Sequence, residues 1–260
     1  MTAAAELFTA PTQENAVAAF FDLDGTLVAE PSLELRLFRA LRQHNQIPVA
    51  NYFRWAFESA RLLPTKGIAA VRHANKQYLA NIPRDLVYRH LHEIPIFSEA
   101  LARVVWHARQ NHRLVLVTGT LEPLAEIAAS AIECELEARG LETKLHICAA
   151  ALEIRHGLWT GKLLGPAMYG AAKADAVRLY ARSQNISLRD SHAYGNSVSD
   201  GHMLAAVGHA HAVNPGKDLA ALANLYDWPV WHWHNEKITR PTPTRVAALE
   251  ANIPQPETRS

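Results

Sequence analysis

Short apolar runs alternate with longer amphipathic segments along most of the chain, which is typical of parallel sheets whose strands are joined by helices. Two runs, residues 16–22 and 113–118, are almost wholly apolar and predict strands buried on both faces. Weaker strand candidates are residues 192–195, 210–214 and 229–233. Helical periodicity marks residues 121–139, 170–183, 199–207 and 217–226. The pattern predicts an α/β fold with a doubly wound parallel sheet.

Two stretches break this alternation. Residues 32–95 carry amphipathic helical segments punctuated by prolines, and their length suits four helices. We therefore predict a small all-helical cap that is inserted after the first strand. The second break, residues 146–164, contains Gly157 and Gly161 between short β-like pieces and predicts a hairpin.

These breaks divide the chain into a core and a cap. The core is predicted to comprise residues 16–31 and 96–236, and the cap residues 32–95. Residues 1–15 are small and polar, and we expect them to be disordered. The tail, residues 237–260, places four prolines among polar side chains and is expected to be flexible.

The composition restricts the class of partner. Lysine and arginine number 26 against 25 for aspartate and glutamate, so no excess charge recruits nucleic acid or a lipid surface. The first residues lack the basic start and apolar run of a signal peptide, and no stretch reaches the apolar length of a membrane span. Cys134 and Cys148 are expected to be reduced thiols. We expect a cytoplasmic protein that acts on a small molecule; its oligomeric state is left open.

Two aspartates directly follow the first predicted strand, in the segment Asp22-Leu23-Asp24-Gly25-Thr26. Reactive groups in open α/β sheets sit at the carboxyl ends of the strands, which is where this pair falls. Two carboxylates so close together repel one another unless a cation or a shared proton relieves the charge, and Mg²⁺ would do so. An Asp-Gly turn that simply ends the strand is the alternative interpretation.

Three further motifs follow later strand candidates. Thr118 and Gly119 offer a hydroxyl and backbone N–H groups to a phosphate, although such a loop also caps ordinary helices. Lys173 lies early in a helix, where it opposes the helix dipole, and so suggests an anionic partner unless it is a solvated surface lysine. Asn196 and Asp200 offer oxygen ligands to Mg²⁺, with helix capping as the competing interpretation.

Taken in order, these motifs resemble those of the haloacid dehalogenase-like (HAD) hydrolase superfamily. They correspond to Asp22-x-Asp24-Gly25-Thr26, Thr118, Lys173 and Gly195-Asn196-x-x-x-Asp200. The resemblance extends over residues 17–214 and implies a HAD-like Rossmannoid core. The helical insertion is similar to a C1-type cap. Together with residues 159–163, it looks closest to subfamily IB, which contains the phosphoserine phosphatases.

The resemblance implies a role for each residue. Asp22 would attack phosphorus and become an aspartyl phosphate, and Asp24 would act as general acid and then as general base. The phosphoryl oxygens would be held by Thr118, Gly119 and Lys173. The expected ligands of the Mg²⁺ cofactor are Asp22, Asp24 through its backbone carbonyl, Asn196 and Asp200.

Two positions depart from the family pattern. Asn196 stands where the family usually has aspartate, and the lost charge is expected to weaken metal binding. Phosphoserine phosphatases carry a glutamate that engages the substrate amine at the place of Pro31, whereas Glu30 lies one residue earlier here. The resemblance implies a Mg²⁺-dependent phosphomonoesterase that acts on a small phosphorylated metabolite. The alternatives are a phosphoserine phosphatase proper and a catalytically weakened scaffold protein on the same fold.

The side chains of the cap and of the C-terminal region leave two questions open. Basic cap residues that could grip an anionic substrate are Arg54, Arg61, Lys66, Arg72 and Lys76. Aromatic residues, which more often form the core of a helical bundle, are Tyr52, Phe53, Trp55 and Phe57. The histidine pairs at 209/211 and 232/234 would make a transition-metal site only if both pairs faced the same way, and surface or partly buried positions are the simpler expectation.

Overall fold

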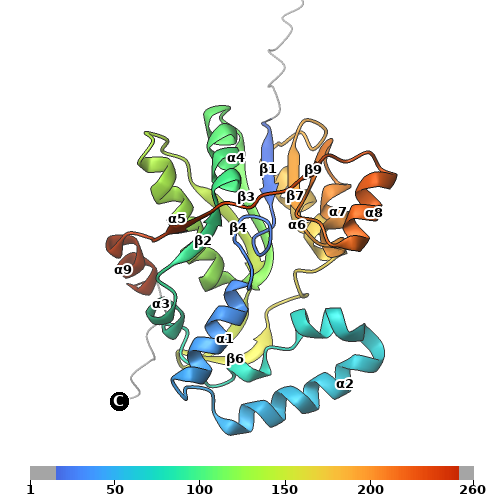
Figure 1. Ribbon diagram of the computed structural model, residues 1–260. Helices are drawn as coiled ribbons and strands as arrows, with labels where there is room; N and C mark the ends of the chain where they lie inside the picture. The colour runs from blue at the N-terminus through green and yellow to red at the C-terminus, as the bar shows by residue number, and fades with distance from the viewer. Residues whose placement is uncertain (1–15, 252–260) are drawn as a thin grey trace, which may run out of the picture.

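A six-stranded sheet forms the centre of the computed structural model, which describes residues 16–251 (Figure 1). Every pair of neighbouring strands is parallel, so the predicted α/β fold is confirmed. In spatial order the strands are β4 (Leu145–Ala150), β3 (Arg113–Leu121), β1 (Ala18–Phe21), β7 (His192–Gly195), β8 (His209–Val213) and β9 (Val230–Trp231). Residues 1–15, which were expected to be disordered, lie outside the described range, as do residues 252–260.

Helices cover both faces of this sheet, because its strands are apolar on both sides. In β1, Ala19 and Phe21 belong to one core and Ala18 and Phe20 to the other, as the two-residue period of a strand requires. The first core contains α4 (Ser98–Arg109) and α5 (Glu122–Glu137). The second contains α6 (Ala171–Ser183), α7 (Gly201–Leu204), which follows the short turn η2 (Val198–Asp200), and α8 (Lys217–Leu225).

A separate group of elements lies below the sheet in Figure 1, on the side of the strands' carboxyl ends. It consists of α1 (Leu33–Gln43), α2 (Val49–Ala74), η1 (Gln77–Leu79), α3 (Leu86–His90) and the hairpin β5 (Leu152–Arg155)–β6 (Leu158–Leu163). The hairpin is joined to the helical segment by hydrogen bonds from Asn81 N to Trp159 O (2.7 Å) and from Trp159 N to Ile82 O (3.0 Å). The division of the chain into core and cap remains a proposal.

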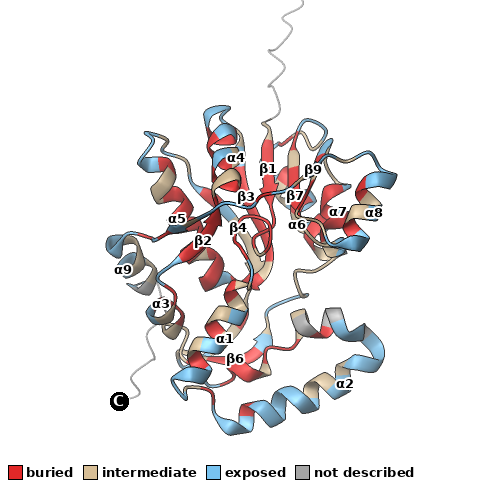
Figure 2. Cartoon of the chain, in the orientation of Figure 1, coloured by how far each residue is buried: buried red, intermediate tan, exposed pale blue. Residues whose placement is uncertain are grey.

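Two details differ from the sequence-based expectation. The segment predicted as a hairpin from residue 146 begins as β4, whose backbone pairs with β3 in the central sheet. The aromatic residues of α2 do not form a bundle core: Phe53 is 73% exposed and Phe57 is 74% exposed. Figure 2 shows α2 as exposed over much of its length, because no layer of helices covers its outer side.

The expected flexible tail is ordered from residue 237 to residue 251. Strand β10 (Glu236–Thr239) pairs antiparallel with β2 (Ile94–Phe97), and α9 (Pro243–Ala251) packs apolar side chains on the first core. Lys237 is 2.6 Å from Glu135, and Arg245 pairs with Glu133 and Glu137. Pro243 begins α9, where a missing backbone N–H costs no helical hydrogen bond. The prolines here therefore mark the start of a helix and not disorder.

The two cysteines agree with the expectation that they are not paired. Cys134 and Cys148 are both free and half-buried, and burial raises the pKa of the Cys148 thiol to about 11. The Cys148 thiol is therefore not activated as a nucleophile at neutral pH. Within residues 16–251, no helix combines the length and the apolar character that crossing a membrane requires.

Candidate active site

The sheet topology brings the sequence motifs to one edge. Strands β3, β1 and β7 are neighbours, and Thr118, Asp22 and Asn196 lie at or just beyond their carboxyl ends. The pairing of β1 with β7 continues past the last strand residue, because Asp22 N donates to Tyr194 O at 2.9 Å. The backbone that carries Asp22 is therefore held by the middle of the sheet.

Lys173 joins two of the predicted carboxylates. Its Nζ lies 2.6 Å from Asp22 Oδ1 and 2.6 Å from Asp200 Oδ1. Lys173 is 4% exposed and Asp200 is 0% exposed, so the interpretation of Lys173 as a solvated surface lysine is wrong. Thr26 donates its hydroxyl to the other oxygen of Asp22 at 3.2 Å. Three charged side chains distant in sequence thus meet in one buried group.

The charges in this group do not balance. Burial raises the pKa of Asp22 to about 7, an effect that Lys173 reduces and Asp200 increases. Burial alone would lower the pKa of Lys173, but Asp200 and Asp22 hold it above its usual value. One cation thus faces two buried carboxylates, and a further cation would lower the pKa of Asp22 and keep it ionised.

Asp200 takes part in the helix capping that the sequence left as one alternative, and it also pairs with Lys173. Its Oδ1 pairs with Lys173, while its Oδ2 accepts from Ser197 N at 2.9 Å, Ser197 Oγ at 2.8 Å and Asn196 N at 3.2 Å. The second set of bonds is a capping box at the start of η2. Ser197, which the sequence prediction did not include, therefore fixes the orientation of Asp200.

Asn196 lies against the loop that carries the two aspartates. A Cβ atom placed on Gly25 would come within 1.9 Å of Asn196 Nδ2, and Gly25 has φ +81°. Both facts require glycine at this position. The Asp-Gly turn is thus real, and it makes room for the Asn196 amide beside Asp22 and Asp24.

The available donors fit the magnesium ion that the family implies. They are the carboxylate of Asp22, the backbone carbonyl of Asp24 and the amide oxygen of Asn196, all hard oxygen ligands of the kind Mg²⁺ prefers. The raised pKa of Asp22 marks the same place as short of positive charge. Asp200, whose two oxygens are engaged by Lys173 and by the capping box, is placed to support this set.

The Asp24 side chain points to the helical side of the site. Its Oδ1 accepts from Leu33 N, the first residue of α1, at 2.8 Å, and its Oδ2 accepts from the Thr120 hydroxyl. Burial raises the pKa of Asp24, and these two hydrogen bonds oppose that shift. A raised pKa suits a carboxyl group that must donate a proton near neutral pH. Thr120 was missed in the sequence, although it directly follows Thr118 and Gly119.

The expected phosphate loop lies under a histidine from α2. Thr118 Oγ1 accepts from Thr120 N at 3.1 Å, and a Cβ on Gly119 would lie 2.9 Å from His73 Nδ1 and 3.0 Å from Met168 O. His73 stacks on Tyr169 with ring centroids 4.6 Å apart, and burial lowers its pKa to about 4. A neutral imidazole therefore covers the loop. No sequence spacing indicated His73.

Two of the basic cap residues pair with carboxylates of the protein, and the side chains of Lys66 and Arg72 lie outside the described residues. Lys76 is buried, and its Nζ lies 2.7 Å from both carboxylate oxygens of Glu34, which also accepts the Tyr78 hydroxyl. Arg61 is exposed and pairs with Glu58 at 2.6 Å. Glu30 Oε1 lies 3.5 Å from the position of a Cβ on Gly25. The Glu30 carboxylate therefore lies beside the aspartate loop despite the one-residue offset.

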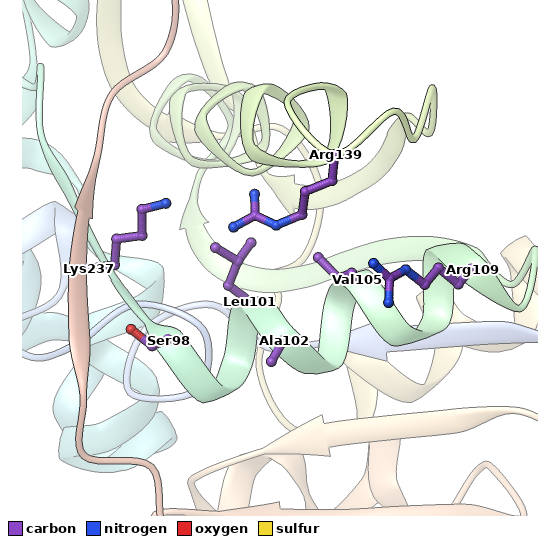
Figure 3. A pocket seen from close by; sticks show the side chains of 7 residues that line it. All are labelled: Ser98, Leu101, Ala102, Val105, Arg109, Arg139 and Lys237. Carbon is purple, nitrogen blue, oxygen red and sulfur yellow. The ribbon is translucent and has the colours of Figure 1, made fainter.

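A separate hollow of about 430 Å³ lies between α4, α5 and β10 (Figure 3). Its lining includes Arg109, Arg139 and Lys237 but none of the motif residues. Arg139 and Lys237 both pair with Glu135, at 2.7 and 2.6 Å. Because no motif residue lines this hollow, it is not the candidate catalytic site.

Comparison with known proteins agrees with this geometry. A family model described as haloacid dehalogenase-like hydrolase matches residues 19–205, a segment that contains every motif residue. A probable phosphatase of Mycobacterium tuberculosis (strain ATCC 25618 / H37Rv) is 27% identical over 263 residues, which cover 95% of this chain and 82% of that protein. A phosphoserine phosphatase of the same strain is 28% identical over 232 residues, which cover 85% of this chain and 72% of that protein.

A solved structure is similar in fold. It is described as a phospho-aspartyl intermediate analogue of phosphoserine phosphatase, and it matches with a TM-score of 0.56 and 17% identity over 85% of this chain and 95% of that chain. The family model spans most of the chain. Motif residues that are far apart along the chain meet in one buried group. This chain belongs to the haloacid dehalogenase-like hydrolase family.

Proposed function

We propose that this phosphatase hydrolyses phosphate monoesters of small metabolites through an aspartyl phosphate on Asp22, with Mg²⁺ as its cofactor. The observation that carries this proposal is the buried group in which Lys173 contacts Asp22 and Asp200 at 2.6 Å each. A nucleophilic carboxylate, a fixed cation and hard oxygen donors at one sheet edge suit phosphoryl transfer, which needs positioning and charge stabilisation above all.

The reaction proceeds in two displacements. Asp22 attacks phosphorus, the bond from phosphorus to the ester oxygen breaks, and Asp24 gives its proton to the leaving alcohol. Asp24, now ionised, takes a proton from water, which attacks the aspartyl phosphate and releases inorganic phosphate. Lys173, the Thr118 hydroxyl and the Gly119 N–H hold the phosphoryl oxygens. Asp22, the Asp24 carbonyl and Asn196, with Asp200 in support, would hold Mg²⁺, which would supply positive charge against those oxygens when bound.

Hydrolysis of a generic aryl phosphate tests the proposal directly. The pure protein is expected to release phosphate with Mg²⁺ and to lose activity when the metal is chelated, with recovery on re-addition. A panel of phosphorylated metabolites then ranks the natural substrates. If the protein releases no phosphate while bound Mg²⁺ is verified, the scaffold alternative replaces this proposal.

Phosphoserine is a second candidate substrate, favoured by the place of Glu30. The carboxylate lies beside the loop of Gly25, where it could pair with a substrate amine. The test compares kcat/KM for phosphoserine with that for phosphoglycolate, which lacks the amine. A preference for phosphoserine of less than about tenfold, which is worth about 1.4 kcal/mol, would contradict amine recognition at this site.

Asn196→Asp is expected to tighten the Mg²⁺ dependence of activity. The change adds a negative charge to the metal ligands and preserves the size of the side chain. We expect the apparent Mg²⁺ constant to fall by about tenfold, an effect of about 1.4 kcal/mol. Ser197 and Asp200 hold the neighbouring backbone in either case. Mg²⁺ titrations of initial rate check the prediction, and an unchanged or weaker apparent affinity would mean that residue 196 is not a ligand.

Thr120→Val is expected to move the alkaline limb of the pH profile of kcat/KM to higher pH, because Asp24 must be protonated to act as the general acid. The Thr120 hydroxyl donates to Asp24 and so lowers its pKa; without it the protonated form of Asp24 is favoured. A hydrogen bond to a charged group is worth about 1.5–3 kcal/mol, so the shift should be on the order of one pH unit. Thr160→Val is the matched control, because Thr160 donates to Glu153 in the hairpin. Identical profiles for both variants would contradict the role of Asp24.

A further inference from the structure

Three histidines meet at the amino-terminal edge of the central sheet, opposite to the candidate active site. His107 lies in the last turn of α4, His112 comes just before β3, and His192 is the first residue of β7. One ring nitrogen of each lies within 4.8 Å of those of the other two. Imidazole nitrogens around a single tetrahedral ion are about 3.3 Å apart, so rings whose nitrogens are farther apart than this would draw closer together to bind one ion.

The end of α4 fixes the first two rings. His112 N donates to His107 O at 3.1 Å, and Asn111 between them has φ 57°, which is the geometry of a Schellman turn. The outer residues of this turn usually bring two apolar side chains into contact. Here two imidazoles take their place, with the Nδ1 atoms 2.8 Å apart. The backbone therefore positions two ligand atoms in advance.

The proton arrangement of His107 suits a metal ligand. Its Nε2 lies 2.9 Å from the hydroxyl of Tyr194, and metal-bound histidines nearly always donate their other N–H to an oxygen. With its proton on Nε2, His107 presents the Nδ1 lone pair to His112. Only one proton fits between the two Nδ1 atoms, and a bound ion replaces it and releases it. Nitrogens around tetrahedral Zn²⁺ are about 3.3 Å apart, so the two rings need to separate by only roughly 0.5 Å.

His211 completes the surroundings but is not a ligand. The Trp231 indole donates to His211 Nδ1 at 3.2 Å, so His211 keeps its proton on Nε2, which faces His192 Nδ1 at 3.3 Å. This contact is the longest of the cluster and is lost at small cost when the His192 ring turns toward an ion. The metal site considered from the pairs 209/211 and 232/234 does not form: His232 and His234 are exposed and stack on one another.

The charges around the cluster select the kind of ion. Burial lowers the pKa of His107 to about 2 and that of His192 to about 4, so both rings are neutral, as ligation requires. A positive charge lies near the cluster, because the Arg103 guanidinium is 4.6 Å from the ring centre of Trp231, whose indole donates to His211. The ligand group found among the described residues contains histidines alone and offers no carboxylate. An ion held mainly by charge, such as Mg²⁺, gains little here. An ion that bonds strongly to imidazole is required.

We propose that His107, His112 and His192 bind a first-row transition-metal ion, best matched by Zn²⁺. His107 is buried while His112 and His192 are partly exposed, so the ion enters from their side and keeps a water molecule as its fourth ligand. This site shares no residue with the proposed catalytic group and does not depend on the proposed reaction.

Metal titration of the untagged full-length protein tests the site. With millimolar Mg²⁺ present throughout, Zn²⁺ binding is followed by calorimetry, and Co²⁺ binding by the visible absorption of a four-coordinate site. One ion per chain is expected. Tyr194→Phe, which removes only the hydroxyl that accepts from His107, should weaken binding by about 10–100-fold. His112→Ala and His192→Ala should weaken it more.

Two controls separate this site from others. His232→Ala changes an exposed histidine outside the cluster, and Asp22→Asn alters the candidate catalytic group; both should bind Zn²⁺ as the unaltered protein does. The proposal is overturned if the unaltered protein shows no Co²⁺ absorption band, or if His112→Ala binds Zn²⁺ with unchanged affinity. It is equally overturned if Asp22→Asn, and not His112→Ala, abolishes binding. Circular dichroism of each variant verifies its fold.

Discussion

Asp22→Asn is expected to abolish turnover while the protein stays folded. An amide cannot form the acyl phosphate, so kcat should fall by at least about four orders of magnitude. The fold should tolerate the change, because Lys173 keeps its contact with Asp200 while one of two competing buried carboxylates disappears. We therefore expect a free energy of unfolding equal to that of the unaltered protein within about 1 kcal/mol, or higher.

Two measurements separate loss of chemistry from loss of structure. Acid quenching during turnover of a labelled substrate should leave a hydroxylamine-sensitive label on the unaltered protein and none on the variant. Asp175→Asn is the matched control, since Asp175 is exposed and pairs with Arg178 on the surface of α6. Full activity of Asp22→Asn would rule out the covalent mechanism, whereas an unfolded variant would rule out the account of the buried charges.

The fold was predictable where the pattern is local. The apolar strands at 16–22 and 113–118 and the strand at 192–195 lie in the sheet as β1, β3 and β7. Strand β4 was read as part of a hairpin, because it is an edge strand that is only partly buried and runs directly into the hairpin β5–β6. Strand β10 forms by pairing with β2, a segment distant in the sequence, and local composition does not reveal such a pairing.

The site was predictable where a motif carries the residue. Asp22, Lys173 and Asp200 meet as their positions at the ends of successive elements suggested. His73 and Glu34 could not be inferred in the same way. The place of His73 depends on how α2 turns at Gly67, whose φ of 73° ends one helical segment and starts the next, and Glu34 in α1 is placed by its contacts with Lys76 and Tyr78. Helix periodicity continues through such a turn, so the sequence shows a helix but not where its end points.

The histidine cluster shows the same limit from another side. The two-residue period of strands favoured 209/211 and 232/234 as ligand pairs, since alternate residues share a face. The close nitrogens instead belong to His107 in the last turn of α4, to His112 in the turn that follows, and to His192 at the start of β7. Hydrophobic periodicity predicts elements but gives no signal for contacts between the ends of different elements.

Lys173→Met is expected to have the largest effect on stability. It leaves Asp22 and Asp200 buried side by side without their shared cation, and breaking a buried pair in this way costs about 3–5 kcal/mol. The pKa of Lys173 is raised in the folded protein, so its contribution is fully present at neutral pH and is lost only as pH rises through the raised value. Lys217→Met, an exposed lysine at the start of α8, is the matched control and should change stability by no more than about 0.5 kcal/mol.

The pH dependence of this loss identifies its cause. Without Lys173 the pKa of Asp22 rises further, so lowering the pH protonates the carboxyl group and removes the unpaired charge. The difference in unfolding free energy between the variant and the unaltered protein should therefore shrink as pH falls from 8 toward 5. The total decrease should be about 1.4 kcal/mol for each pH unit by which the pKa of Asp22 in the variant exceeds that in the unaltered protein. Adding Asp200→Asn should restore part of the stability without restoring turnover. A loss that is constant with pH, and that Asp200→Asn does not reduce, would mean that Lys173 acts through packing and not through its charge.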